Sequence, residues 1–432
     1  MKSTISLFVF VIYIVINVLF VVITSSTDSS QLKLVFMIHR HGDRTPIQSY
    51  PTDPYANSSY WPDGWGQLTT KGKQRMYALG EYIRRRYQDF LTIDPREVYI
   101  RSSGSDRCLE SAALVMAGMY RPDDRWIWDN QLGKQWQPFA IQTVPHDNDS
   151  MLNPGSHCVS AEQELSRIRG SSQYISITQK KKGLLDYVSI NSGRNVTDLD
   201  SAEKIFDVIA IEQQNGYKLP LWIDTPTFDA LKDISDITFV LDFSTHLIQR
   251  LRTGLLLKDV INRAKEEISK NKNNTHSYNS IKKKIFIYST HDTQLATLMN
   301  ALHNFDNKSP PFGSTILIEL RQSNSNYTFN FYYMNDTYSK PIPLGLPNCT
   351  DHQNECSFTQ FVESVNDLIP DDWDHECHNT HTSCESTTVM AYLFGSLMTL
   401  AVIAILYIIF IIFRRKPNQI AYHMLPNKAV IN

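Results

Sequence analysis

The sequence predicts an α/β fold, a three-layer sandwich with a mostly parallel central sheet, an inserted, mainly helical cap domain and one transmembrane helix. Short apolar runs typical of buried strands alternate with stretches of helical periodicity, which is the pattern of an α/β protein. Between about residues 140 and 255 helix and loop outweigh strand, so we expect the cap to be inserted there. A long apolar stretch near the C-terminus carries no charge and predicts the membrane helix.

The expected elements follow from local patterns. A near-continuous apolar run predicts a strand buried on both faces, whereas apolar residues repeating every three to four positions predict a helix with one buried face. Strands are expected at 32–38, 97–101, 285–289, 315–320 and 327–334, the last two forming a hairpin across a polar turn. Helices are expected at 70–87, 106–119, 202–214 and 245–268.

Two apolar stretches set the expected topology. The first, 5–23, is typical of a secretory signal that ends near residue 26, although an uncleaved anchor is the alternative. The second, 389–413, exceeds the ~20 residues needed to span a bilayer. Arg414, Arg415 and Lys416 follow it and indicate a cytosolic tail, 414–432. We therefore expect a single-pass type I membrane protein of the lysosomal or endosomal membrane or the cell surface, with residues 27–388 luminal or extracellular.

Composition agrees with a secreted, folded domain. The 432 residues carry a net charge of −2 and are 42% hydrophobic, which supports a sizeable core and does not indicate a nucleic-acid binder. Six cysteines are expected to pair in part, but their spacing does not fix the pairing. Asn307 is a poor glycosylation acceptor because Pro310 follows its motif. The remaining Asn-x-Ser/Thr acceptors are Asn57, Asn148, Asn195, Asn273, Asn326, Asn335 and Asn348.

The tail contains a short sorting-like pattern. Tyr422 is followed three residues later by Leu425, a spacing that fits the pocket of a sorting adaptor. The alternative is that these are ordinary residues of an exposed tail.

The strongest chemical signal is the run Arg40-His41-Gly42-Asp43-Arg44-Thr45-Pro46, directly after the first strand. Attack on a doubly charged phosphate monoester requires that charge to be balanced, and two arginines offer permanently charged, fork-shaped donors. Loops that leave the carboxyl ends of strands are where open α/β sheets bind ligands. The alternative, a structural histidine between solvated arginines, is disfavoured because the whole run occupies that position.

Two further strand ends carry polar residues. His291 and Asp292 follow the 285–289 strand, and Asp292 could protonate a leaving oxygen. Alternatively, Asp292 caps the helix that begins at Thr293. Arg101 ends the 97–101 strand and could add positive charge for phosphate, or it is an ordinary surface arginine.

These runs resemble the histidine acid phosphatases, and most closely their membrane-anchored lysosomal and prostatic type. The Arg-His-Gly-Asp-Arg-Thr-Pro run is that family's signature and the downstream His-Asp pair is its second. The resemblance spans roughly residues 31 to 380 and includes looser matches at 68–74, 100–103, 219–222 and 254–260.

The resemblance implies that His41 attacks phosphorus and becomes a phosphohistidine, that Asp292 gives its proton to the leaving alcohol, and that water then releases phosphate. It implies no metal or cofactor, and it suggests a homodimer. The residues implied to bind the phosphoryl oxygens are Arg40, Arg44, Arg101 and His291. The implied disulfides are Cys158 with Cys377 and Cys349 with Cys356, which leave Cys108 and Cys384.

A proton-donating aspartate predicts a pH dependence. A free Asp has a pKa of ~3.9, and a bound phosphate dianion should raise that pKa because like charge disfavours the carboxylate. Turnover is therefore expected to be best in mildly acidic medium.

Three alternatives differ from this prediction. Residues 375–384 resemble a metal cluster in residue types, but a disulfide at Cys377 would remove a ligand. A phytase or inositol-polyphosphate phosphatase would use extra basic groups, for which 180–182, Arg167 and Arg169 are weak candidates. A non-catalytic membrane glycoprotein could retain the fold, but such a relative usually loses a signature residue, and this chain retains them.

Overall fold

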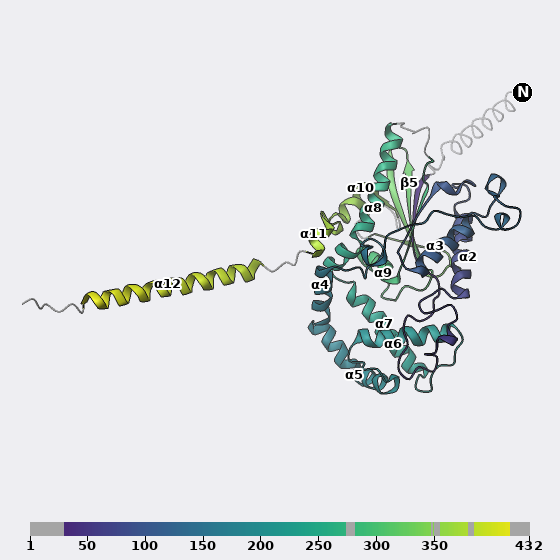
Figure 1. Cartoon of the computed structure of the whole chain (residues 1–432). Coiled ribbons are helices and arrows are strands. Elements are labelled where there is room, and N and C mark those ends of the chain that lie inside the picture. The colour runs from purple at the N-terminus through teal and green to yellow at the C-terminus, as the bar shows by residue number, and fades with distance from the viewer. Residues whose placement is uncertain (1–29, 274–280, 347–348, 350–354, 379–383, 415–432) are drawn as a thin grey trace, which may run out of the picture. The chain divides into compact units, whose positions relative to one another are not determined.

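The computed structural model describes residues 30–273, 281–346, 349, 355–378 and 384–414 (Figure 1). The chain divides into two compact units, 1–378 and 379–432. The first unit is built on one sheet with strand order β3-β2-β4-β1-β5-β6-β7, and β8 pairs with β6. The strands are β1 (Gln31–Arg40), β2 (Val98–Ser102), β3 (Gln142–Thr143), β4 (Ile285–Thr290), β5 (Thr315–Ser323), β6 (Asn326–Met334), β7 (Ile342–Leu344) and β8 (Glu355–Ser357).

The sheet is mixed. β3, β2, β4 and β1 are joined by parallel pairings, whereas β5 pairs antiparallel with β1, and β6, β7 and β8 continue with antiparallel pairings. The predicted hairpin is β5–β6, with Thr315 opposite Met334. The parallel half is the part that matters for the site, because the carboxyl ends of its strands meet at one edge.

Helices cover both faces of the sheet, as predicted. Leu34, Phe36 and Ile38 of β1 share a core with residues of α8 and α9, whereas Val35 and Met37 share the opposite core with α2 and α3. Successive side chains of a strand point to opposite faces, so a strand buried on both faces reads as a continuous apolar run. The helices are α2 (Thr70–Arg86), α3 (Asp106–Met119), α8 (His246–Asn273) and α9 (Asp292–Ala301), and α10 (Phe358–Ser364) follows β8 (Figure 1).

A group of helices with its own core is inserted between β3 and α8. Its apolar residues, among them Leu185, Ile205 and Leu231, form a cluster separate from the two sheet cores. Helix α6 begins at Leu199, before the predicted start, because Asp198 and Ser201 form a capping box. These helices are α4 (Val159–Arg169), α5 (Ser172–Ser192), α6 (Leu199–Gln214) and α7 (Thr225–Asp242).

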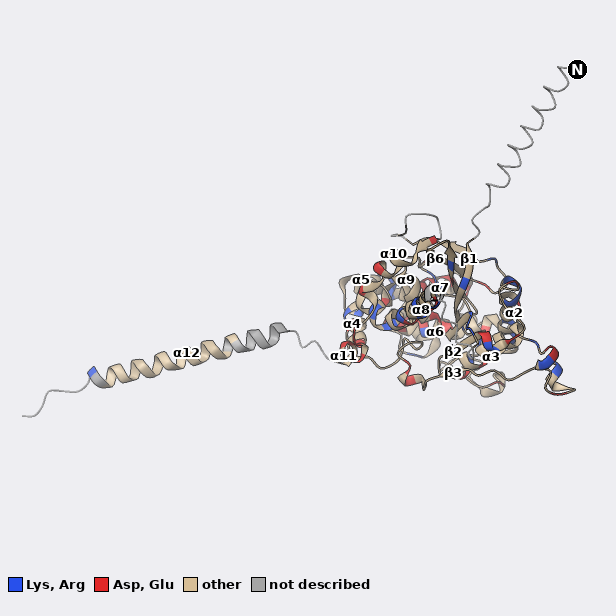
Figure 2. Cartoon of the chain, turned by 90° about the horizontal axis from the view of Figure 1, so that it is seen from above, with Lys and Arg blue, Asp and Glu red and all other residues tan. Residues whose placement is uncertain are grey.

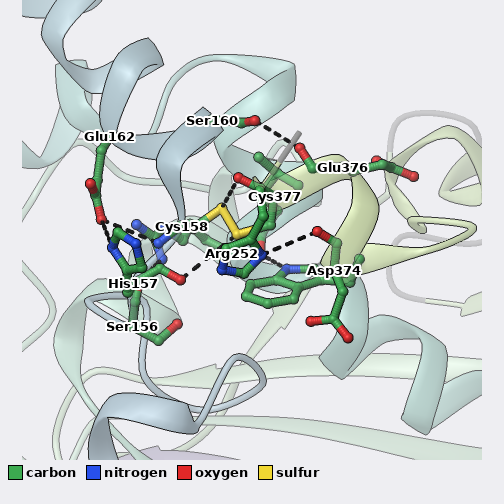
Figure 3. The surroundings of a disulfide bond; sticks show 12 residues. Ser156, His157, Cys158, Ser160, Glu162, Arg252, Asp374, Glu376 and Cys377 are labelled. Atoms are coloured by element: carbon green, nitrogen blue, oxygen red, sulfur yellow. Dashed lines mark hydrogen bonds and ion pairs between the residues drawn. A yellow bond between two sulfur atoms is a disulfide. The ribbon is translucent and has the colours of Figure 1, made fainter. Parts of the chain in front are cut away.

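Two disulfides match the pairings that the resemblance implied. Cys158 is bonded to Cys377, and Cys349 is bonded to Cys356. The first joins the start of α4 to α11 (Trp373–His378), where the Ser160 hydroxyl also donates to the Glu376 carbonyl (Figure 3). Because its sulfur is bonded to Cys158, Cys377 cannot serve as a thiolate metal ligand.

The second unit contains α12 (Cys384–Arg414). Within it, Phe394–Ile412 has a mean hydropathy of 2.7, which by length and composition suits a membrane span. Between Phe394 and Ile412 α12 has no Lys, Arg, Asp or Glu, and Arg414 is blue in Figure 2.

Several predicted features lie outside the described residues. These are the signal at 1–26, Asn348 and the tail pattern of Tyr422 and Leu425. Of Asn273 and Cys384 the structure describes only the backbone. The other five glycosylation acceptors, Asn57, Asn148, Asn195, Asn326 and Asn335, are exposed.

Candidate active site

The two signature runs meet at one edge of the sheet. β1 and β4 are parallel neighbours, and Arg40 lies opposite Thr290 in their register. His41 and His291 are thus the first residues after adjacent strands, and their ring centroids lie 5.7 Å apart. Both line a cavity of about 720 Å³, whose opposite wall is formed by the cap helices.

The histidine after β1 is held in one tautomer. The Nδ1 of His41 lies 2.9 Å from the Gly42 carbonyl oxygen, which can only accept, so Nδ1 carries the proton. The Nε2 of His41 accepts from the Nε of Arg107 at 3.1 Å. Burial, Arg107 and Arg40 together hold the pKa of His41 well below its usual value. Nε2 therefore carries no proton, and its electron pair accepts from Arg107.

The turn at Gly42 requires glycine. A Cβ at this position would lie 2.6 Å from the Gly72 carbonyl oxygen, so α2 approaches the backbone here more closely than any other residue would allow. This contact fixes the backbone that carries His41.

The two arginines of the run converge on the same cavity region. The Nη2 of Arg40 lies 2.6 Å from an oxygen of Asp292, and the guanidinium stacks over the Phe312 ring at 4.0 Å. Arg44 holds Asp207 of α6 with both terminal nitrogens, at 3.0 and 3.1 Å. Each guanidinium is more than nine-tenths buried.

The structure does not bring Arg101 into the site. Its guanidinium donates to both oxygens of Asp149, at 2.8 and 3.1 Å, and to the Ser102 carbonyl oxygen at 2.6 Å. It is buried and is not among the residues that line the cavity. These contacts indicate that Arg101 has a structural role: it joins the end of β2 to Asp149.

A third arginine that the sequence reasoning missed lies in the site. Arg107, in the first turn of α3, lines the cavity and contacts His41. α3 begins just after β2, so its first turn lies at the edge where β1 and β4 end. A charged residue at a helix start beside this edge was the available signal, because helix N-termini favour anions.

Asp292 is not the N-cap of α9, as the alternative expected, because the helix begins at Asp292 itself and His291 is its N-cap. It is the first residue of α9, and one carboxylate oxygen accepts from the Thr293 backbone N–H at 2.8 Å. The other oxygen pairs with Arg40. Burial acts to raise the pKa of Asp292, but Arg40 and Arg44 outweigh it, and the pKa is lowered.

His291 is neutral at ordinary pH. Burial, followed by the nearby charge of Arg107, lowers its pKa to about 3. Its Nε2 lies 3.0 Å from the hydroxyl oxygen of Ser103, which follows β2.

A second residue missed by the sequence reasoning is Glu203 of α6. It lines the cavity together with Asp207 and Asp292, and burial and these two carboxylates raise its pKa to about 8. With Asp200 and Asp207 on the same helix, it gives the cap side of the cavity an acidic wall.

Most basic residues considered for a polyphosphate substrate lie elsewhere. Lys181 and Lys182 pair with Asp233 and Asp186 away from the cavity, and Arg167 pairs with Glu164 on exposed surface. Arg169 does line the cavity, but it is shared between Asp200 and Asp242.

The fold and the site together define a class: an α/β protein with a buried, neutral histidine ringed by three arginines at a strand end. Residues 31–334 match the model of the histidine phosphatase superfamily, branch 2. The chain belongs to this superfamily.

Curated relatives cover most of the chain. The chain is 34% identical to human prostatic acid phosphatase (Homo sapiens) over 86% of this chain and 94% of that protein. It is 31% identical to rat lysosomal acid phosphatase (Rattus norvegicus) over 93% of this chain and 92% of that protein.

Solved structures share the fold at low identity. The phytase from Citrobacter braakii superposes with a TM-score of 0.59 at 17% identity, covering 81% of this chain and all of that chain. A multiple inositol polyphosphate phosphatase from Bifidobacterium longum superposes with a TM-score of 0.53 at 11% identity, over 81% of this chain and 95% of that chain.

Proposed function

We propose that this protein is an acid phosphatase that hydrolyses phosphate monoesters through a phosphohistidine at His41. The observation that carries the proposal is the tautomer of His41, whose unprotonated Nε2 accepts from Arg107 in a cavity that Arg44 and Asp292 also line, with Arg40 paired to Asp292. The relatives named prostatic and lysosomal acid phosphatase support the same activity.

The reaction proceeds in two steps. Nε2 of His41 attacks phosphorus while Arg40, Arg44, Arg107 and His291 balance the charge on the phosphoryl oxygens. The bond to the ester oxygen breaks, and Asp292 protonates that oxygen as the alcohol leaves. Water then attacks the phosphohistidine and gives a proton to Asp292, which restores His41 and releases phosphate. Arg101 has no role in this scheme because, unlike Arg40 and Arg44, it lines neither cavity beside Asp292 and is paired with the buried Asp149.

The ion pair of Arg40 and Asp292 links substrate binding to protonation. A phosphate dianion that takes the Arg40 guanidinium removes the partner that keeps Asp292 ionised. The like charge of the dianion then raises the pKa of Asp292. Binding thereby favours the protonated carboxyl that the leaving group needs.

A phytase or inositol-polyphosphate phosphatase is the second candidate, and its support is the shared fold of solved enzymes of those types. The carboxylates of Asp200 and Asp207 on the cap side argue against it, because a substrate with several phosphates would meet like charge beside the site. We therefore favour substrates with one phosphate. A non-catalytic glycoprotein is disfavoured because the chain retains His41, Arg40, Arg44, His291 and Asp292.

The proposed location is a lysosomal or endosomal membrane or the cell surface. We propose that the N-terminal apolar stretch is a signal, that Phe394–Ile412 spans the membrane and that the phosphatase domain is luminal or extracellular. Glycosylation at the exposed acceptors, sorting through Tyr422 and Leu425 and a homodimer are part of the same proposal.

The test is the full-length His41→Ala variant in detergent, assayed on p-nitrophenyl phosphate at acidic pH. We expect no activity above the uncatalysed rate. His246→Ala is the matched control, because His246 is an exposed histidine that pairs with Asp367 and does not line the cavity. Equal rates for wild type and His41→Ala would end the enzyme proposal. A panel of phosphotyrosine, sugar phosphates, nucleotides and phytate then separates the two substrate classes.

A further inference from the structure

A chain of hydrogen bonds runs from His146, in the segment between β3 and α4, through Ser103 to His291. Ser103 is buried, and its hydroxyl oxygen lies 3.0 Å from His291 Nε2 and 3.5 Å from His146 Nδ1. His146 belongs to the short turn His146–Asn148 and lines the same cavity, with its ring 5.8 Å from that of His291.

The loop after β2 is pressed against this turn. A Cβ at Gly104 would lie 2.6 Å from the Val144 carbonyl oxygen and 2.8 Å from the His146 nitrogen, so only glycine permits the approach. This contact holds Ser103 between the two histidines.

Asn153 determines which atoms donate and which accept along these hydrogen bonds. Its Oδ1 accepts from the Gly155 N–H at 3.0 Å, so its Nδ2 is the donor side. One hydrogen of Nδ2 goes to the His146 carbonyl oxygen at 2.9 Å, and the other points at His146 Nε2 at 3.2 Å. Nε2 of His146 must therefore be an acceptor, and the neutral ring carries its proton on Nδ1.

The same assignment of donors and acceptors extends through Ser103 to His291 in the active site. Nδ1–H of His146 donates to the Ser103 oxygen, and the hydroxyl hydrogen of Ser103 then has His291 Nε2 as its acceptor. A neutral His291 that accepts at Nε2 carries its own proton on Nδ1. Among the described residues only the weakly accepting Cys108 sulfur lies in range of that Nδ1, at 3.9 Å, and it is as near to Nε2, at 3.8 Å. It therefore does not hold the Nδ1 proton, which is available to a ligand.

We propose that His146, acting through Ser103, is a positioning residue that holds His291 in the tautomer able to donate from Nδ1 to a phosphoryl oxygen. This inference rests on the proposed function, in which His291 contacts the phosphoryl group. Neither Ser103 nor His146 touches the reacting atoms in this scheme. Their effect on the rate therefore passes entirely through His291.

The experiment is a double-mutant comparison on the full-length protein. Ser103→Ala and His146→Gln are each made in the wild type and in His291→Ala, and kcat/KM for p-nitrophenyl phosphate is measured at acidic pH. In the wild type each should lower kcat/KM about tenfold, the effect of losing one hydrogen bond to the developing charge. In His291→Ala each should cause no further loss, because residues that act as a unit are not additive.

His146→Asn is the matched control. An asparagine places its amide near the position of Nδ1 and can still donate to Ser103, whereas a glutamine places it near Nε2. We expect His146→Asn to retain most of the activity that His146→Gln loses. Ser103→Thr, which keeps the hydroxyl, serves the same purpose if Ser103→Ala lowers the unfolding temperature.

Equal losses in the two backgrounds, or equal losses for His146→Asn and His146→Gln, would overturn the inference. These outcomes differ from failure of the proposed function, which would appear as activity retained by His41→Ala.

Discussion

The Nη2 of Arg40 lies 2.6 Å from the Oδ2 of Asp292, although Arg40 ends β1 and Asp292 follows β4. Arg44 is paired in the same way with Asp207. Two of the arginines proposed to receive phosphate thus already hold carboxylates, and a substrate must compete with them. Because Arg40 and Arg44 lower the pKa of Asp292, that carboxylate remains a competitor in mildly acidic medium until the substrate displaces it.

The proposed role of Asp292 predicts that its effect depends on the leaving group. Asp292→Asn should lower kcat about 10²–10⁴-fold for an alkyl phosphate, whose alkoxide needs a proton. The loss should be much smaller for p-nitrophenyl phosphate, because p-nitrophenolate leaves without one. A steady-state comparison of both substrates checks this. The same loss on both would assign Asp292 to binding rather than to proton donation.

The pH profile has a predicted sign. The donor form of Asp292 disappears as pH rises through its pKa in the substrate complex, so kcat should fall toward neutral pH. His41 stays neutral across the mildly acidic range because its pKa is well below the usual value. A pH series on an alkyl phosphate should show the fall, and Asp292→Asn should flatten it. A rate that is flat from acidic to alkaline pH in the wild type would contradict the assignment.

Arg107 and Arg101 should respond differently to removal. Arg107→Ala takes away a donor in the cavity, so we expect kcat/KM to fall about 10²–10³-fold with little change in stability. Arg101→Ala leaves Asp149 buried without its partner, which should cost about 3–5 kcal/mol of unfolding free energy. Kinetics and urea titrations on both variants test the contrast. A stable, inactive Arg101→Ala protein would show that Arg101 acts in the reaction.

The raised pKa of Glu203 predicts that the free energy of unfolding depends on pH. Its pKa in the folded protein is about 8, above its usual value, so the folded state binds the extra proton. Stability from this group is therefore full below its unfolded pKa and falls as pH rises toward about 8. Glu203→Gln should raise the unfolding temperature at pH ~7.5 relative to wild type and change it little at pH ~4. If the unfolding temperatures of wild type and Glu203→Gln differed by the same amount at both pH values, the prediction would be contradicted.

The two disulfides should differ in their effect on stability. Cys158 and Cys377 are 219 residues apart in sequence, whereas Cys349 and Cys356 are 7 apart. Loop-closure entropy gives about 5 kcal/mol for the first and about 2 kcal/mol for the second. Denaturant unfolding of Cys158→Ser/Cys377→Ser and Cys349→Ser/Cys356→Ser measures both. A larger loss for the short loop would show that strain or packing, not chain entropy, dominates.

The fold was largely predictable because its strands and helices have local signals. The apolar run at 32–38 reads as a strand buried on both faces, and β1 is such a strand. The start of α6 was missed because its capping box precedes the apolar periodicity. The mixed pairing of the sheet depends on how distant strands meet, which no local pattern specifies.

The site was predictable where a residue directly follows a strand. His41, Arg44, His291 and Asp292 meet in one cavity as expected, and Arg40 joins them through Asp292. Arg101 also lies at a strand end, but Asp149 holds it, and that partner comes from a distant loop. Arg107 and Glu203 reach the cavity from helices, where the direction of a side chain depends on how the helix packs.

The bond between Cys158 and Cys377 also affects what proteolysis can do. Most of the cap, α8 and the Asp292 strand end lie between these cysteines, while His41 lies before them. A protease that cuts an exposed turn between Cys158 and Asp292 therefore produces two fragments that remain one covalent molecule. Only a cut followed by reduction would let the fragment bearing His41 separate from the one bearing Asp292.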